Sequence, residues 1–128
     1  MKFLLDTHAL LWTLDAPEKL SSRAREMVQN LNSEVYVSIA TPWELAIKAN
    51  HGGLDVVELL QDFEHSLSSG GYQLLETRVS HVIRAGLLPR HHRDPFDRLL
   101  IAQSIETGLP LLSCDEKFDL YGVERIWS

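Results

Sequence analysis

The sequence predicts an α/β fold: a three-layer sandwich with a central, mostly parallel sheet and helices on both faces. One observation predicts this fold class, and a second predicts the number of domains. Short apolar segments typical of buried strands alternate with segments of helical periodicity, an order that indicates the βαβ crossovers joining parallel strands. No segment of the 128 residues is long enough to act as a linker between two domains. We therefore expect one domain over residues 1–128, with a strand order that the sequence does not define.

The N-terminal part of the chain is expected to form strands and helices in alternation. Residues 2–6 form an apolar strand, and a leucine stripe over residues 10–14 predicts a helix directly after it. Ser21 or Ser22 can cap the next helix with its hydroxyl oxygen. A second strand is expected over residues 34–39.

A capping box is predicted at the start of the following helix. Thr41 stands in the capping position, Pro42 in the first helical position and Glu44 in the third, where its carboxylate can reach back to the cap. This helix is expected to run to about Asn50 and to stop at Gly52-Gly53.

The C-terminal part continues the alternation and ends in a strand. Asp94 and Pro95 repeat the pattern of a cap followed by a proline, with Asp97 in the third helical position. The expected elements are an amphipathic helix over 57–67, a strand over 72–76, a short helix over 80–85, a helix from 95 to Gly108, a strand over 109–113 and an edge strand over 123–127.

Acidic residues stand at the joints between these strands and helices. They are Asp6, Glu44, Asp94, Asp97 and Asp115. In an open parallel sheet these joints share one edge, so carboxylates distant in sequence would crowd a single cleft. The repulsion between these carboxylates must be relieved, either by a bound cation or by raised pKa values of the carboxyl groups. Because hard carboxylate oxygens are the ligands that Mg²⁺ and Mn²⁺ prefer, the sequence predicts such a site and disfavours zinc.

Each acid also has an ordinary structural explanation. Asp6 and Asp94 can cap helices, and Asp97 can complement a helix dipole. Glu44 fits the capping box, and Asp115 fits a turn. The metal-site hypothesis therefore depends on the joint placement of the acids.

Charge and composition restrict the classes of partner. The formal net charge of −6 disfavours broad, non-specific binding to nucleic acid, because phosphate contacts normally come from Lys and Arg. Basic residues gather locally, and we expect Arg90, Arg93 and Arg98 to contact substrate phosphates. For His91 and His92 we expect a solvated loop or phosphate contacts rather than metal ligation.

Other conspicuous residues have plainer interpretations. Trp12, Trp43 and Trp127 are expected to pack in the core or an interface, and Cys114 is expected in or near the core. A single cysteine fits a reducing compartment, and no segment approaches the ~20 apolar residues that a membrane helix needs. We expect a cytoplasmic protein without a membrane segment.

Four stretches together resemble the PIN-domain ribonucleases. They are Leu5-Asp6-Thr7-His8, the helix of Glu44, the run from His92 to Gln103 and Ser113-Cys114-Asp115. Chain length and the run Asp-Pro-Phe-Asp-Arg-Leu-Leu-Ile-Ala are most similar to VapC-type toxins of bacterial type II toxin–antitoxin pairs. The resemblance implies a metal-dependent endoribonuclease with Mg²⁺ or Mn²⁺ as cofactor and tRNA or rRNA as the expected target class.

The resemblance also implies roles for particular residues and partners. Asp6, Glu44, Asp97 and Asp115 match the acids that hold the metal ions, and Asp115 matches the most variable of them. Asp94 looks like a cap, and Thr7 and Ser113 match small hydroxyl residues beside the metals. A small antitoxin protein and a second copy of the chain are the implied partners.

Two other functions are compatible with a strand-end aspartate. A haloacid-dehalogenase-like phosphatase would use Asp6 as a covalent nucleophile, but its usual second Asp two residues later is here His8. A non-catalytic receiver or interaction module would need an acidic pair before a central strand-end Asp and a later Lys, and neither fits Asp6 near the N-terminus.

Overall fold

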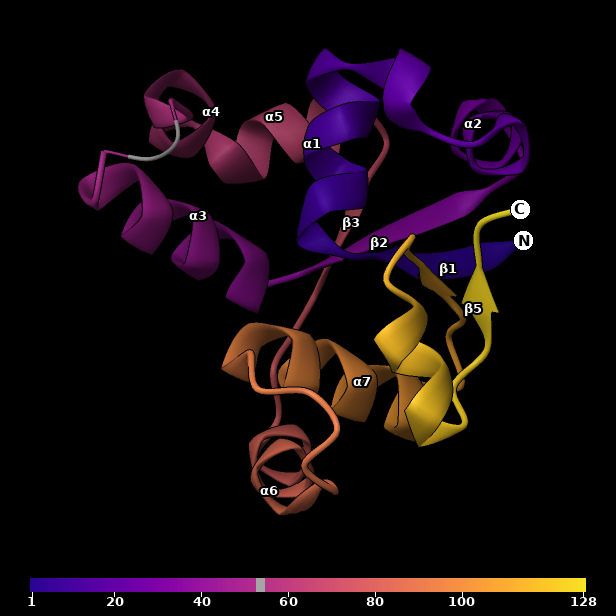
Figure 1. The fold of residues 1–128 in the computed structure, drawn as a ribbon. Coiled ribbons are helices and arrows are strands. Elements are labelled where there is room, and N and C mark those ends of the chain that lie inside the picture. The colour runs from indigo at the N-terminus through magenta and orange to yellow at the C-terminus, as the bar shows by residue number, and fades with distance from the viewer. Residues whose placement is uncertain (53–54) are drawn as a thin grey trace.

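A computed structural model describes residues 1–52 and 55–128, and its sheet has five strands, each parallel to its neighbours. The strands are β1 (Lys2–Leu5), β2 (Glu34–Ser38), β3 (Gln73–Leu75), β4 (Leu111–Leu112) and β5 (Arg125–Ile126). Their order is β3-β2-β1-β4-β5, so the N-terminal strand lies in the middle (Figure 1). The predicted α/β class and parallel sheet are confirmed.

Helices connect the strands as crossovers. Those described are α1 (Thr7–Asp15), α2 (Ser22–Gln29), α3 (Ala40–Asn50), α4 (Val57–Gln61), α5 (Phe63–Ser69), α6 (Val79–Leu87), α7 (Pro95–Thr107) and the 3-10 helices η1 (Pro17–Lys19) and η2 (Glu116–Tyr121). The segment predicted as one helix over 57–67 is two, because the backbone leaves the helical region at Asp62 (φ −139°). Gly53, expected to help stop α3, lies outside the described residues. Within the described residues, no helix is both long and apolar enough to cross a membrane.

The sheet separates two cores, which explains why β1 is apolar throughout. Phe3 and Leu5 pack in one core with side chains of α1 to α5, whereas Leu4 packs with Leu100 and Ile101 of α7 in the other. Figure 1 shows α1 to α5 on one side of the sheet and α7 with η2 on the other, and α6 packs against α7. The predicted three-layer arrangement is confirmed.

The parallel register brings the carboxyl ends of the central strands to one edge. Leu5, the last residue of β1, pairs with Val37 of β2 and with Leu112 of β4. The segments that leave these strands therefore begin side by side. The candidate site lies at this edge.

Candidate metal centre

Asp6 is both a helix cap and a member of the acidic cluster. Its Oδ1 accepts a hydrogen bond from the main-chain N–H of Ala9 (2.8 Å), which caps α1, and its Oδ2 accepts from Oγ of Ser113 (2.6 Å). Burial raises the pKa of Asp6, and the hydrogen bonds from Ser113 and Ala9 offset this only in part. The two interpretations of Asp6 are thus compatible, because each carboxylate oxygen has lone pairs to spare.

Ser113 connects two of the acids. It is fully buried after β4, and its Oγ donates to Asp6 while accepting from the main-chain N–H of Asp115 (3.0 Å). A single hydroxyl therefore fixes the spacing between the end of β1 and the turn that follows β4.

Glu44 does not belong to a capping box, and that prediction is wrong. Helix α3 begins at Ala40, so Thr41 lies inside it, and its buried Oγ1 has no hydrogen-bond partner in the described residues. Glu44 instead accepts a hydrogen bond from Thr7 Oγ1 (2.5 Å) and pairs with Lys48 Nζ (2.8 Å). The structural explanation that competed with a site role for Glu44 is removed.

Lys48 is a site residue that the sequence analysis missed. Burial lowers its pKa, but the hydrogen bond to Glu44 and the charges of Glu44, Asp94 and Asp97 raise it above the ordinary value. Its place four residues after Glu44 is the usual spacing of a helical ion pair, and this signal could have identified it.

Asp97 faces the other acids from the first turn of α7. Asp94 caps this helix, as predicted, with Oδ1 accepting from the main-chain N–H of Phe96 (2.8 Å) and of Asp97 (3.3 Å). The pKa of Asp97 is raised to about 8, first by burial and then by the charges of Asp94, Asp6, Glu44 and Asp115. The pKa of Asp97 therefore responds to the charges of all the other acids at this edge of the sheet.

Asp115 joins the cluster through His92. Its Oδ1 caps η2 by accepting from the main-chain N–H of Lys117 (3.0 Å), and its Oδ2 accepts from Nε2 of His92 (2.9 Å). Burial raises the pKa of Asp115, but the hydrogen bonds from His92 and Lys117 outweigh it, and the net shift is downward. Asp115 therefore stabilises a turn, as predicted, and also lies in the acidic cluster.

His92 was expected in a solvated loop or at a phosphate, and the first expectation is wrong. The residue is only 8% exposed, and its Nε2 also lies 3.2 Å from Oδ2 of Asp97. Its Nδ1 accepts the main-chain N–H of Asp94, the helix cap two residues later. A histidine two residues before a helix cap can be recognised in the sequence, and the sequence analysis did not use this signal.

The predicted phosphate-binding arginines separate into two groups. The Arg98 guanidinium donates to the main-chain carbonyls of Gly86, Leu88, Pro89 and His92, at 2.9–3.4 Å. These bonds engage both terminal amino groups of Arg98 and hold the His92 loop, which disfavours the predicted phosphate contact. Arg90 and Arg93 are exposed, and neither forms an ion pair within residues 1–52 and 55–128.

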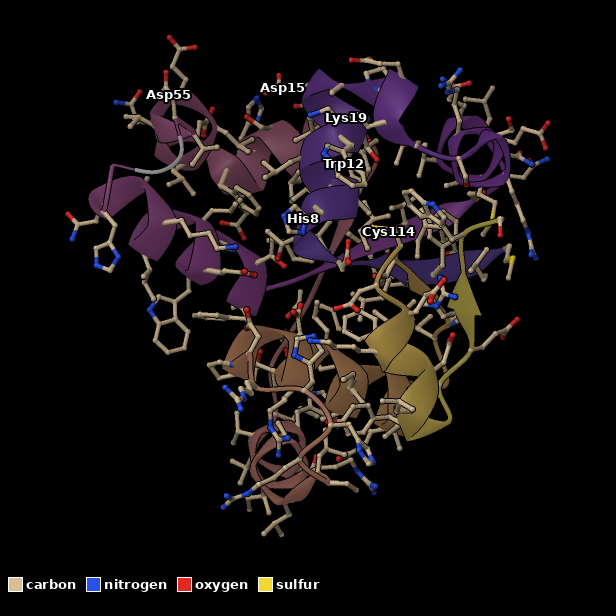
Figure 2. All side chains as sticks on the ribbon, viewed as in Figure 1. His8, Trp12, Asp15, Lys19, Asp55 and Cys114 are labelled. Carbon is tan, nitrogen blue, oxygen red and sulfur yellow. The ribbon has the colours of Figure 1, made fainter. Side chains whose placement is uncertain are left out.

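Three further residues lie near the site or differ from expectation. Cys114 is exposed, so its predicted place in or near the core is wrong (Figure 2). His8, exposed in the first turn of α1, lowers the pKa of Asp6 through its charge. Trp43 does not lie in the core: it is 64% exposed and packs edge-on against Phe96, with ring centroids 5.1 Å apart.

The donor set fits a hard divalent cation. Carboxylates from four joints gather here, and the pKa of Asp97 is raised first by its burial and then by the charges of the other acids. His92, Asp97 and Asp115 offer atoms that all lie within 4.8 Å of one another. Carboxylate oxygens suit Mg²⁺ or Mn²⁺, and a bound cation would relieve the repulsion.

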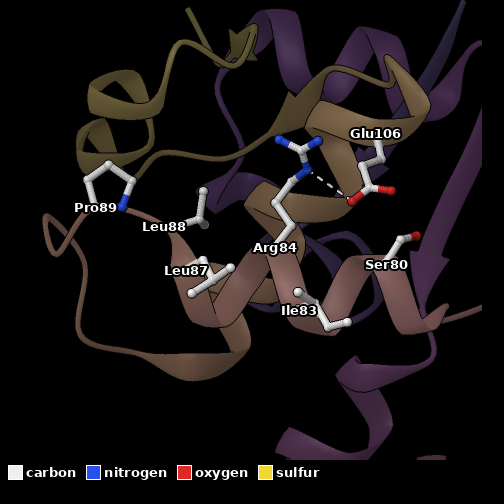
Figure 3. Close-up of a pocket in the computed structure, with 7 residues that line it drawn as sticks. All are labelled: Ser80, Ile83, Arg84, Leu87, Leu88, Pro89 and Glu106. Atoms are coloured by element: carbon white, nitrogen blue, oxygen red, sulfur yellow. Dashed lines mark hydrogen bonds and ion pairs between the residues drawn. The ribbon is translucent and has the colours of Figure 1, made fainter.

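A separate pocket of about 620 Å³ lies against α6, away from the acids. Figure 3 shows its lining, in which Ile83 and Leu87 are apolar and Arg84 pairs with Glu106 at 3.0 Å. None of the clustered carboxylates lines it. Its size alone therefore does not connect it with the chemistry of the acidic edge.

The family model of the PIN domain matches residues 3–124 of this chain. The chain therefore belongs to the PIN-domain family. Its fold is similar to that of VapBC2 from Rickettsia felis, solved with a DNA fragment from the promoter (TM-score 0.71, 15% identity, 100% of both chains covered). It is also similar to VapBC-1 from nontypeable Haemophilus influenzae (TM-score 0.67, 16% identity, 98% of this chain and 97% of that chain). Among curated proteins, none matches the sequence significantly.

The cap role of Asp94 can be separated from a ligand role. We expect Asp94→Ala to lower the free energy of unfolding by about 1 kcal/mol, because two main-chain N–H groups lose their acceptor. Asp94→Asn should lose much less, since Asn caps equally well. Both variants should keep their stabilisation by Mg²⁺ in thermal unfolding, and loss of that stabilisation in Asp94→Asn would make Asp94 a ligand.

Proposed function

We propose that this chain is a metal-dependent endoribonuclease of the VapC type, the toxin component of a type II toxin–antitoxin pair. The observation that carries the proposal is the convergence of Asp6, Glu44, Asp97 and Asp115, with the pKa of Asp97 raised to about 8 by burial and its acidic neighbours. Membership of the PIN family and the fold shared with two VapBC structures support it.

In this proposal the carboxylates of Asp6, Glu44, Asp97 and Asp115 hold Mg²⁺ or Mn²⁺. When bound, the ions would supply a water of lowered pKa for attack on an RNA phosphodiester and stabilise charge on the leaving oxygen. Thr7 orients Glu44, Ser113 orients Asp6, and Lys48 balances the charge of Glu44. Arg90 and Arg93, both exposed, are our candidates for contacts with flanking phosphates.

RNA cleavage by the purified protein tests the proposal. We expect tRNA or rRNA to be cut at defined positions in Mg²⁺ or Mn²⁺ and to stay intact in EDTA, with cleavage ends mapped by primer extension. Single-stranded DNA of the same sequence is the control for substrate class. Equal cutting with and without EDTA, or no cutting of any RNA, would remove the assignment.

The two alternative functions lose support at Asp6. A haloacid-dehalogenase-like phosphatase would need a second Asp two residues after Asp6, and that position holds His8. A receiver needs a phosphoacceptor open to its partner kinase, whereas Asp6 is 5% exposed. The absence of a trapped aspartyl-phosphate would count against both.

We also propose two protein partners, a cognate antitoxin and a second copy of this chain. Similarity to two VapBC structures supports the antitoxin. For the homodimer, helix α6 leaves Val79, Val82, Ile83 and Leu87 exposed, more apolar surface than one short helix ordinarily presents to water. A single PIN domain over residues 1–128 and a cytoplasmic location remain predictions from the sequence.

The homodimer proposal gives a testable prediction. We expect Ile83→Glu to shift the molar mass measured by light scattering from twice the chain mass to the chain mass, because a carboxylate would be buried against the partner. Leu120→Glu, on η2, is the matched control, since Leu120 is comparably exposed. A wild-type protein that is monomeric at micromolar concentration would contradict the prediction.

A further inference from the structure

His92 lies between two carboxylates that belong to different elements. Its Nε2 is 2.9 Å from Oδ2 of Asp115, which precedes η2, and 3.2 Å from Oδ2 of Asp97, in the first turn of α7. The ring is buried, so water competes little for these contacts. One ring nitrogen therefore binds Asp115 and lies close to Asp97.

The main chain defines which ring nitrogen carries the proton. Nδ1 of His92 accepts the main-chain N–H of Asp94 at 3.2 Å. An accepting nitrogen bears a lone pair, so the proton of the neutral ring is on Nε2. In this tautomer Nε2 donates to Oδ2 of Asp115 and cannot ligate a cation. His92 thus belongs to the hydrogen-bond donors of the centre, although its atoms lie close enough for ligation.

Both elements that carry these acids also hold the loop of His92. Arg98, on α7, donates to the carbonyl of His92 (3.2 Å). Tyr121, at the end of η2, accepts from the main-chain N–H of His92 (2.7 Å) and donates to the carbonyl of Pro89 (2.7 Å). The Phe118 ring lies beside the imidazole, with centroids 5.7 Å apart. The ring is therefore held from both sides before any ligand arrives.

From this geometry we infer that His92 is a positioning residue of the metal centre, whose Nε2–H binds Asp115 and so holds it beside Asp97, at the spacing at which the two acids receive a divalent cation. The inference rests on the proposed function for the identity of the reaction. Without this donor Asp115 would be free to move away from Asp97, and cation binding would have to order it again. Hydrogen bonds to metal ligands typically contribute about 10–100-fold to metal affinity.

Three variants of the full-length chain test the inference. His92→Asn can still accept the N–H of Asp94 but is too short to reach the carboxylates, whereas His92→Gln carries an amide N–H at about the place of Nε2. His91→Asn changes the exposed neighbouring histidine and is the matched control. Mn²⁺ affinity is measured from the electron paramagnetic resonance signal of free Mn²⁺.

We expect Mn²⁺ affinity to fall by about 10–100-fold in His92→Asn, to be partly restored in His92→Gln and to be unchanged in His91→Asn. Wild-type affinity in His92→Asn would overturn the inference, as would failure of the wild type to bind Mn²⁺. A role confined to anchoring the loop would show as an intact His92→Asn and an impaired His92→Gln.

A measurement on the wild type holds even if the variants fail to fold. In protein labelled with ¹⁵N-histidine, the imidazole spectrum should show His92 protonated on Nε2 and not on Nδ1, both without and with Mg²⁺. A proton on Nδ1, or loss of the Nε2 proton when Mg²⁺ is added, would overturn the inference.

RNA cleavage by the same samples separates this inference from the proposed function. If the order of Mn²⁺ affinities holds but the wild type cuts no RNA, the nuclease proposal fails and the positioning role remains. If the wild type cuts RNA and His92→Asn binds Mn²⁺ normally, the nuclease proposal stands and the positioning role is refuted.

Discussion

Asp97→Asn should abolish RNA cleavage, lowering its rate by at least about 100-fold, and should remove the stabilisation of the protein by Mg²⁺. Asp97 experiences the charges of Asp94, Asp6, Glu44 and Asp115, so its carboxylate stands where a shared cation would bind. Loss of a ligand costs more than the roughly 10–100-fold typical of a residue that only supports one. Cleavage is measured with labelled RNA, and stabilisation as the change in Tm on adding Mg²⁺.

The matched control is Glu58→Gln, which removes an exposed carboxylate on α4. It should leave both cleavage and the Mg²⁺-induced rise in Tm unchanged. A ligand present at 100 times its Kd stabilises a folded protein by about 2.7 kcal/mol, so its loss in Asp97→Asn is readily measured. Retention of that stabilisation in Asp97→Asn would show that this carboxylate serves only its helix.

In EDTA, the stability of the wild-type protein should fall as the pH rises from about 5 to about 8. The pKa of Asp97 is raised from 3.8 to about 8, so in this range the folded state holds a proton that the unfolded state has released. A raised pKa contributes stability that is complete below 3.8 and is lost as the pH passes through about 8. The slope can reach roughly 1.4 kcal/mol per pH unit.

Thermal unfolding in EDTA at several pH values checks this prediction. Tm should fall by a few degrees per pH unit towards pH 8, whereas Asp97→Asn should fall less steeply, with the remaining slope due to Asp6, whose pKa is also raised. Asp115 has a lowered pKa, so its contribution has the opposite sign and is lost only as the pH falls below the usual aspartate range. A wild-type Tm that rises between pH 5 and 8 would contradict the assignment.

Mg²⁺ should weaken this dependence, because the cation replaces the proton on Asp97 and the folded state then no longer holds a proton that the unfolded state lacks. The Mg²⁺-induced rise in Tm should therefore grow as the pH approaches 8. The same pH series repeated in Mg²⁺ measures this growth directly.

Signals within a few residues of sequence correctly identified several strands and helix starts. The apolar run of β1, a cap of α2 at Ser21 or Ser22 and the Asp94-Pro95 start of α7 were all predicted, since each depends on neighbours a few residues away; the structure shows Ser21 as the cap. The capping box at Thr41 failed because α3 starts earlier, at Ala40. Its acid, Glu44, found its partner Thr7 at a distance of 37 residues in sequence.

The same distinction applies to the candidate site. That acids stand at strand–helix joints was visible in the sequence, and parallel strands bring such joints to one edge. The spacing of His92 before the Asp94 cap was visible, but its other contacts were not, because they depend on Asp115, Arg98 and Tyr121, which the fold brings to it. The identical residue types His91 and His92 differ only in what the fold places beside them.

The sequence by itself determined the alternation of strands and helices, the parallel sheet and the position of each acid at a joint, because these follow from periodicity and capping within a few residues. Only the tertiary structure decided the strand order, the burial of His92, the hydrogen bond between Thr7 and Glu44 and the use of Arg98 to hold a loop. The physical reason is that strand pairing, desolvation and hydrogen-bond partners are set by contacts between distant parts of the chain.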